Sequence, residues 1–163
     1  MGPGVSRAAE KTDMMQKWDM EADVVCVGYG GAGAAAAISA HDAGARVLIL
    51  EKMPEGGGNT AVSGGGFISP TNEEEAYTYF TNLYKFSFSE MDADVVRVFA
   101  AESVKNVDWV KSLREGTEVT IYGHAGYPTV PGAKSMNKYG VLGKAKGMSG
   151  RSQNLWDMYT YAV

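Results

Sequence analysis

The chain has 163 residues and a formal net charge of −4 at pH 7, and its 15 lysines and arginines are scattered, so no nucleic-acid-binding surface is predicted. Its single cysteine, Cys26, excludes a disulfide framework and a CxxC metal site, and we expect no metal site elsewhere. No apolar run reaches the ~20 residues that span a bilayer, so we also expect no membrane span.

Residues 1–21 form a polar N-terminal extension, in which Ser6 is a candidate N-cap for a short helix that ends near Trp18. The extension lacks the apolar central region of a secretory signal peptide, which favours a cytoplasmic protein. An exported form whose leader has been removed stays open.

A strand, a helix and a second strand follow in close succession. The apolar run Asp23–Val27 stops at the glycine-rich turn Gly28–Gly33, an alanine-rich helix ends at Gly44, and the second strand covers Arg46–Leu50. Continuous apolar runs are typical of parallel strands that are covered on both faces. The segment therefore predicts a βαβ unit with a parallel pair of strands.

The glycine spacing in this unit matches a dinucleotide-binding turn. Gly28 permits the tight turn, Gly30 lets backbone amides approach a pyrophosphate, and Gly33 lets the helix pack closely on the strand. Glu51 follows the second strand, where a carboxylate accepts hydrogen bonds from a ribose diol and repels a 2′-phosphate. A plain βα turn would explain the glycines but not Glu51, so we expect a dinucleotide without a 2′-phosphate.

Residues 51–70 are rich in glycine and predict a long loop, and loops of this length inside compact domains are usually functional. With the preceding unit they resemble the flavoprotein subunits of fumarate reductases and succinate dehydrogenases, especially the soluble branch with urocanate reductases and 3-ketosteroid dehydrogenases. The resemblance rests on Glu51-Lys52, then Gly57-Gly58-Asn59-Thr60, then the pair Gly64-Gly65. It implies that this loop lies along the FAD pyrophosphate and against the flavin ring, where glycines permit close backbone contact. The cofactor-binding residues so implied are Gly28, Gly30, Gly31, Ala32, Gly33, Glu51, Lys52, Asn59, Thr60, Gly64 and Gly65.

The same resemblance bears on how the cofactor is held. Membrane-bound relatives attach FAD to a histidine of this loop, whereas Gly58 or Asn59 stands at that place here, which implies noncovalent FAD. An NAD-binding dehydrogenase fragment is disfavoured, because nicotinamide sites do not require the loop that follows Glu51.

Residues 71–163 predict helices followed by a flap. Asn72 is the expected N-cap of a helix over about 73–86 whose aromatic residues belong to the core, and a second helix begins at Asp92 or Asp94 and ends at Gly116. A short strand is expected over 117–122.

Residues 123–150 are rich in glycine, proline and lysine and predict a loop or flap, and Ser152 is the expected cap of a last helix over 153–163. The predicted fold class is thus α/β. Residues 22–70 form the N-terminal part of a Rossmann-like FAD-binding domain (βαβ), and residues 71–163 form the mostly helical start of a cap or substrate domain that is incomplete.

The catalytic residues stay open. Tyr127, His124 and Arg151 are candidates because they lie within or beside the flap, and loops carry function disproportionately. His41 is expected to face solvent. The resemblance implies that Phe99 replaces a cap-helix tyrosine of the ketosteroid dehydrogenases, which counts against simple 1,2-dehydrogenation, and that the catalytic arginine would follow Val163.

Only two parallel strands are predicted, which leaves the predicted sheet unfinished. The chain would then be an N-terminal piece of a larger flavoenzyme, a truncated reading frame, or one subunit of a split enzyme whose companion subunit completes the FAD and cap domains. The full assembly would be an oxidoreductase that moves a hydride between FAD and a small-molecule substrate with an activated C–C bond. The alternative is a non-catalytic FAD-binding subunit, or a remnant of a split or truncated flavoenzyme. Under either hypothesis we expect the chain to be inactive alone.

Overall fold

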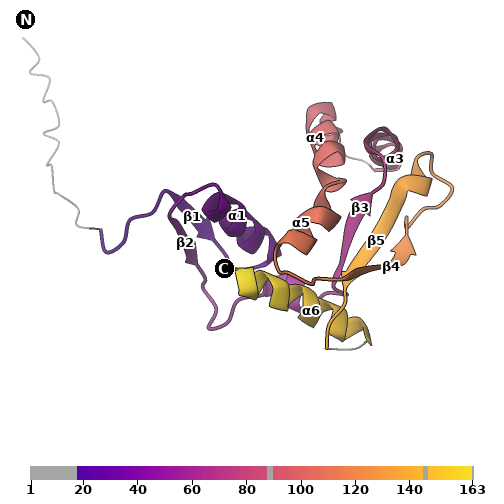
Figure 1. Cartoon of the computed structure of the whole chain (residues 1–163). Coiled ribbons are helices and arrows are strands. Elements are labelled where there is room, and N and C mark those ends of the chain that lie inside the picture. Colours follow the sequence, from indigo (N-terminus) through magenta and orange to yellow (C-terminus); the bar gives the residue numbers. More distant parts are fainter. Residues whose placement is uncertain (1–17, 88–89, 145–146, 163) are drawn as a thin grey trace, which may run out of the picture.

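The computed structural model describes residues 18–87, 90–144 and 147–162, which form two small sheets joined by helices (Figure 1). In the first sheet, β1 (Val24–Val27) pairs in parallel with β2 (Val47–Leu50), and α1 (Gly31–Asp42) connects them. This unit confirms the predicted βαβ start of an α/β fold. The helix expected after Ser6 falls on residues outside the described ranges.

One face of the β1–β2 sheet is covered and the other is not. Ala34, Ala37 and Ile38 of α1 are buried, as is Cys26 of β1. Side chains alternate along a strand, and Val25 and Val27 on the opposite face are 49% and 85% exposed. In the described part of the chain, α1 therefore covers only one side of this sheet.

The second sheet is antiparallel, with the order β3-β5-β4. Its strands are β3 (Gly66–Pro70), β4 (Val119–His124) and β5 (Met136–Val141). The strand predicted over 117–122 is thus confirmed as β4, two residues further along the chain.

Two predicted loops contain regular structure. Residues 51–70 include α2 (Gly58–Val62) and β3, and the predicted flap includes the 3₁₀ turn η1 (Ala133–Ser135) and β5, the central strand. Glycine and lysine made these segments resemble loops, but pairing with strands distant in the sequence overrides that local preference. Because β3 pairs with β5, the sheet joins residues on both sides of the expected domain boundary at 70, which stays a prediction.

Two helices begin where their capping residues predict. In α3 (Glu73–Tyr84) the Asn72 side chain accepts a hydrogen bond from the Glu75 N–H at 2.9 Å, and in α4 (Ala93–Ser103) Asp92 accepts two from the first turn. The expected single helix to Gly116 is instead broken before α5 (Asn106–Ser112).

Two hydrogen bonds to β3 fix the segment between α4 and α5. Ser69 Oγ donates to the Val104 carbonyl oxygen at 3.2 Å, and Asn106 Nδ2 donates to the Ile68 carbonyl oxygen at 2.7 Å. These bonds anchor the chain between the helices to the sheet, so α5 takes its own direction.

The last helix, α6 (Gly147–Ala162), passes from the antiparallel sheet to the βαβ unit (Figure 1). It begins earlier than predicted, and Ser152 is a buried residue inside it, 2% exposed, rather than its cap. Leu155 and Met158 of α6 share an apolar cluster with Ile38 of α1 and Val110 of α5. The helix thus ties the two sheets together.

A second apolar cluster lies between α3, α4 and η1. It confirms the expected core position of the aromatic residues only in part, since Tyr79 is buried whereas Tyr84 and Phe86 are exposed. Among the described residues, no helix is long and apolar enough to cross a membrane.

Candidate functional site

The glycine turn closes β1 onto α1. Gly28 has a φ of +102°, which favours glycine, and its N–H donates to the Leu50 carbonyl oxygen at 2.7 Å. A side chain at Gly33 would collide with the Gly28 carbonyl oxygen. The turn therefore has the tight bend and close helix packing that its sequence predicts.

The N-terminal end of α1 presents backbone amides beyond the turn. The helical hydrogen bonds begin with Ala34 N–H donating to the Gly30 carbonyl oxygen at 2.9 Å, so the N–H groups of Ala32 and Gly33 have no acceptor within the helix. At Gly30, the atom nearest to an added Cβ would be the Gly57 carbonyl oxygen, 3.8 Å away. Protein packing alone therefore does not require glycine there, and the open space suits a pyrophosphate.

Glu51 is fixed beside this turn. Its Oε2 accepts a hydrogen bond from the Tyr29 N–H at 2.7 Å, and its Oε1 accepts one from the Met53 N–H at 2.8 Å. The bonds from Met53 and Tyr29 hold the pKa of the Glu51 carboxyl below its ordinary value. The ionised, exposed carboxylate keeps lone pairs on both oxygens for the hydroxyls of a ribose.

The second glycine segment packs directly against the first. Gly57 N–H donates to the Tyr29 carbonyl oxygen at 2.6 Å, and Gly31 N–H donates to Thr60 Oγ1 at 3.1 Å. A side chain at Gly31 would collide with Thr60. The structure thus brings the turn, Glu51 and Thr60 together.

The remaining predicted cofactor residues lie around this arrangement. Lys52 and Asn59 are exposed. Gly65 lies between α2 and β3 with a φ of +64°, and its N–H donates to Ser63 Oγ at 3.0 Å. Gly64 directly precedes it. These residues extend the site from the turn toward the antiparallel sheet.

Two aromatic residues at this site were not predicted. The Tyr29 and Trp156 rings lie with their centroids 5.1 Å apart, and a side chain at Gly56 would collide with the Tyr29 ring. Burial raises the pKa of the Tyr29 hydroxyl. Tyr29 occupies a variable position of the glycine motif and Trp156 belongs to a distant helix, so no spacing signal connects them.

The three catalytic candidates are not brought together. His124 ends β4, where its Nδ1 lies 2.8 Å from Asn137 Oδ1, and the exposed Tyr127 donates its N–H to the Tyr79 hydroxyl oxygen at 3.3 Å. Both lie at the Pro70 end of the sheet, whereas the glycine segment enters at Gly66. Arg151 belongs to α6. His41 is exposed, as expected.

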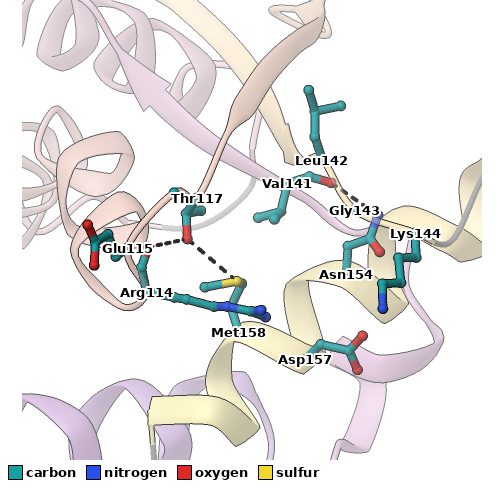
Figure 2. Close-up of a pocket in the computed structure, with 11 residues that line it drawn as sticks. Arg114, Glu115, Thr117, Val141, Leu142, Gly143, Lys144, Asn154, Asp157 and Met158 are labelled. Carbon is teal, nitrogen blue, oxygen red and sulfur yellow. Dashed lines mark hydrogen bonds between the residues drawn. The ribbon is translucent and has the colours of Figure 1, made fainter.

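A separate pocket of about 370 Å³ lies between the turn that follows α5, the end of β5 and α6 (Figure 2). Arg114 and Lys144 supply positive charge and Glu115 and Asp157 negative charge, so the pocket does not select one sign of ligand. None of the predicted cofactor residues lines it. Among the described residues, no group of three or more His, Cys, Asp or Glu side chains could hold a metal ion.

Comparison with known proteins finds a family model and relatives that match this chain. Residues 23–160 match the family model described as "FAD binding domain". The chain is 34% identical over 116 residues to a fumarate reductase (cytochrome) of Shewanella frigidimarina, a match covering 66% of this chain and 20% of that protein. It is 34% identical over 103 residues to a 3-oxo-5-alpha-steroid 4-dehydrogenase of Comamonas testosteroni, which covers 58% of this chain and 19% of that protein.

A solved structure shows the same fold. The 3-ketosteroid-delta4-(5alpha)-dehydrogenase of Rhodococcus jostii RHA1 superposes with a TM-score of 0.70 at 21% identity, over 93% of this chain and 37% of that chain. The chain thus spans about a fifth of the length of these curated relatives and little more than a third of the solved structure.

Proposed function

Because this chain belongs to the FAD binding domain family, we propose that it is the FAD-binding portion of a flavoprotein oxidoreductase that transfers a hydride at a C–C bond. The observation that carries the proposal is the Glu51 carboxylate, fixed by two backbone N–H groups beside the outward-pointing amides of α1. When bound, FAD supplies the hydride chemistry, and the protein supplies binding and orientation.

Each part of the site has a role in holding the cofactor. The Ala32 and Gly33 amides, at the positive end of the α1 dipole, bind the pyrophosphate, and Gly30 leaves room for it. Glu51 accepts hydrogen bonds from the adenosine ribose. Thr60 holds the second glycine segment against the turn.

The rest of the second glycine segment faces the flavin end of the cofactor in this proposal. Lys52, Asn59, Gly64 and Gly65 continue the site toward the flavin. Because Gly58 and Asn59 offer no nucleophile for a flavin bond, FAD is held noncovalently.

The substrate in this proposal is a small molecule with an activated C–C bond, as the names of the fumarate-reducing and steroid-dehydrogenating relatives suggest. A companion subunit would complete the FAD and cap domains, and the uncovered face of the β1–β2 sheet at Val25 and Val27 supports this part. Tyr127, His124 and Arg151 stay candidates for proton transfer.

One observation favours a non-catalytic FAD-binding subunit as the second hypothesis. The three catalytic candidates come from separate places, and two of them lie at the end of the antiparallel sheet away from the glycine segment. Efficient proton transfer requires the donor to be positioned near the reacting atoms.

The test is an FAD titration of two alanine variants, followed by flavin fluorescence. Glu51→Ala removes the ribose acceptor and should cost about 1.5–3 kcal/mol, or roughly tenfold and upwards in Kd. Glu55→Ala is the matched control, since it removes an exposed carboxylate from the same segment. Equal affinity of the two variants would remove Glu51 from the site, and no binding by the unsubstituted chain would refute the proposal.

A further inference from the structure

Tyr29 connects the parts of the cofactor site through its backbone. Its N–H donates to Glu51 Oε2 at 2.7 Å, and its carbonyl oxygen accepts from the Gly57 N–H at 2.6 Å. One residue therefore fixes both the carboxylate and the second glycine segment. Any shift of Tyr29 moves both groups.

The Tyr29 side chain is held from outside the βαβ unit. Its ring packs on the Gly56 backbone, where a side chain would collide with it, and on Trp156 of α6, with centroids 5.1 Å apart and planes at 58°. Trp156 also borders the buried Gly57, since a Cβ built there would lie 3.5 Å from Trp156 Cε2. Trp156 therefore packs on Tyr29 of the first glycine segment and lies next to Gly57 of the second.

Trp156 is held in place by its own helix, α6. The Tyr159 ring lies 6.2 Å from the Trp156 ring and 6.1 Å from the Trp109 ring of α5. Leu155, next to Trp156, is buried in the cluster with Ile38 of α1. An aromatic series thus runs from the glycine turn through α6 to α5.

We propose that Trp156 is a positioning residue of the cofactor site, which through Tyr29 holds the glycine turn and the Glu51 carboxylate in the geometry that receives FAD. This inference rests on the proposed FAD-binding function. Affinity depends on how much of the bound geometry exists before binding, because ordering a loop on binding costs free energy. Trp156 acts by keeping the turn ordered in the free protein.

The experiment compares Trp156→Ala with Trp109→Ala, which removes an indole from the same aromatic series without a ring contact to Tyr29. We expect Trp156→Ala to weaken FAD binding about tenfold, and Trp109→Ala to change Kd by less than about twofold. Trp156→Phe should recover most of the affinity, because a ring remains against Tyr29. In the free protein, hydrogen exchange at the Tyr29 and Gly57 amides should accelerate in Trp156→Ala only.

A Tyr29→Ala background separates positioning from general destabilisation. If Trp156 acts through Tyr29, adding Trp156→Ala to Tyr29→Ala leaves Kd within about twofold of the single Tyr29→Ala variant. If the Tyr29→Ala and Trp156→Ala effects on Kd multiply instead, the inference is overturned. Equal losses of FAD affinity in Trp156→Ala and Trp109→Ala would also overturn it. In both cases FAD binding by the unsubstituted chain remains intact. If Trp156→Ala fails to fold, Trp156→Leu is compared with Trp156→Phe, which keeps a ring against Tyr29. Equal Kd values for these two variants would overturn the inference. No FAD binding by the unsubstituted chain would refute both proposals.

Discussion

Asp23 and Glu51, at the start of β1 and just after β2, are each held by backbone N–H groups. Asp23 Oδ2 accepts from the Arg46 backbone N–H at 2.9 Å and from Arg46 Nε at 3.1 Å, and Oδ1 accepts from Nη2 at 3.0 Å. The hydrogen bonds from the Arg46 side chain, and then from its backbone, lower the pKa of Asp23 to about 2. Asp23 thus ties together the starts of two strands, whereas Glu51 is the ribose acceptor in the proposed FAD site.

The lowered pKa of Asp23 predicts a pH dependence of stability. The pKa of the Asp23 carboxyl falls from 3.8 in the unfolded chain to about 2 on folding. The ionised carboxylate therefore stabilises the fold at pH values above 3.8, and this contribution disappears as pH falls from about 4 to about 2. Urea midpoints of the unsubstituted chain should fall more than those of Asp23→Asn between about pH 5 and pH 3. A residual fall in the variant is expected from Glu51, and identical falls in both proteins would contradict the prediction.

At the scale of elements, the sequence predicted the helices, strands and turns whose sequence signals lie within the element or next to it. The βαβ unit, the caps at Asn72 and Asp92 and the tight turn at Gly28 each follow from residues within a few positions. The strands β3 and β5 could not be predicted, because their pairing partners lie far along the chain and their glycines favour loops. For the same reason Glu51 was recognisable from the sequence, but Trp156 was not.

Gly132 provides a test of how η1 packs on α3. Its φ is +86°, and an added side chain would collide with the Glu75 carbonyl oxygen and lie 2.8 Å from the Tyr79 backbone nitrogen. Gly132→Ala should lower the free energy of unfolding by at least the ~1–3 kcal/mol of backbone strain. Gly126→Ala is the control, since a Cβ there meets no atom within 4 Å. Equal urea midpoints for the two variants would show that η1 is not packed as described.

At the scale of the whole molecule, the β1–β2 sheet leaves apolar side chains uncovered. Val25, Val27 and Leu50 are 49%, 85% and 48% exposed, and exposed apolar faces and strand edges promote association. The α/β start could be predicted from the sequence. The antiparallel sheet beside it and the bridging helix α6 could not, because they depend on packing between distant segments.

This uncovered face predicts that the isolated chain associates with itself. Val27→Lys places a charge on the exposed face and should shift the molecular mass measured by light scattering toward the monomer without lowering the melting temperature. Ser39→Lys, at an exposed position of α1, is the control and should leave the mass unchanged. A monomeric unsubstituted chain would contradict the prediction.

The isolated chain, supplied with FAD, should show no turnover of fumarate, urocanate or a 3-ketosteroid with a redox dye. Catalysis requires a proton donor and charge stabilisation near the flavin, and the candidates do not converge in the described structure. Activity that appears only when a companion subunit is added would support the hypothesis that the chain is one subunit of a split enzyme. Robust turnover by the chain alone would refute the proposal that it is inactive without a companion subunit.

The packing of α6 on α1 also sets an order of events during synthesis. The strands and glycine turn of the βαβ unit leave the ribosome before Leu155 and Trp156, which cover Ile38 and Tyr29 and emerge only after the antiparallel sheet has been synthesised. Closing so long a loop is entropically costly and slow compared with local helix formation. The nascent βαβ unit is therefore incomplete until α6 docks, and FAD captured earlier would meet a turn that is not yet held in place.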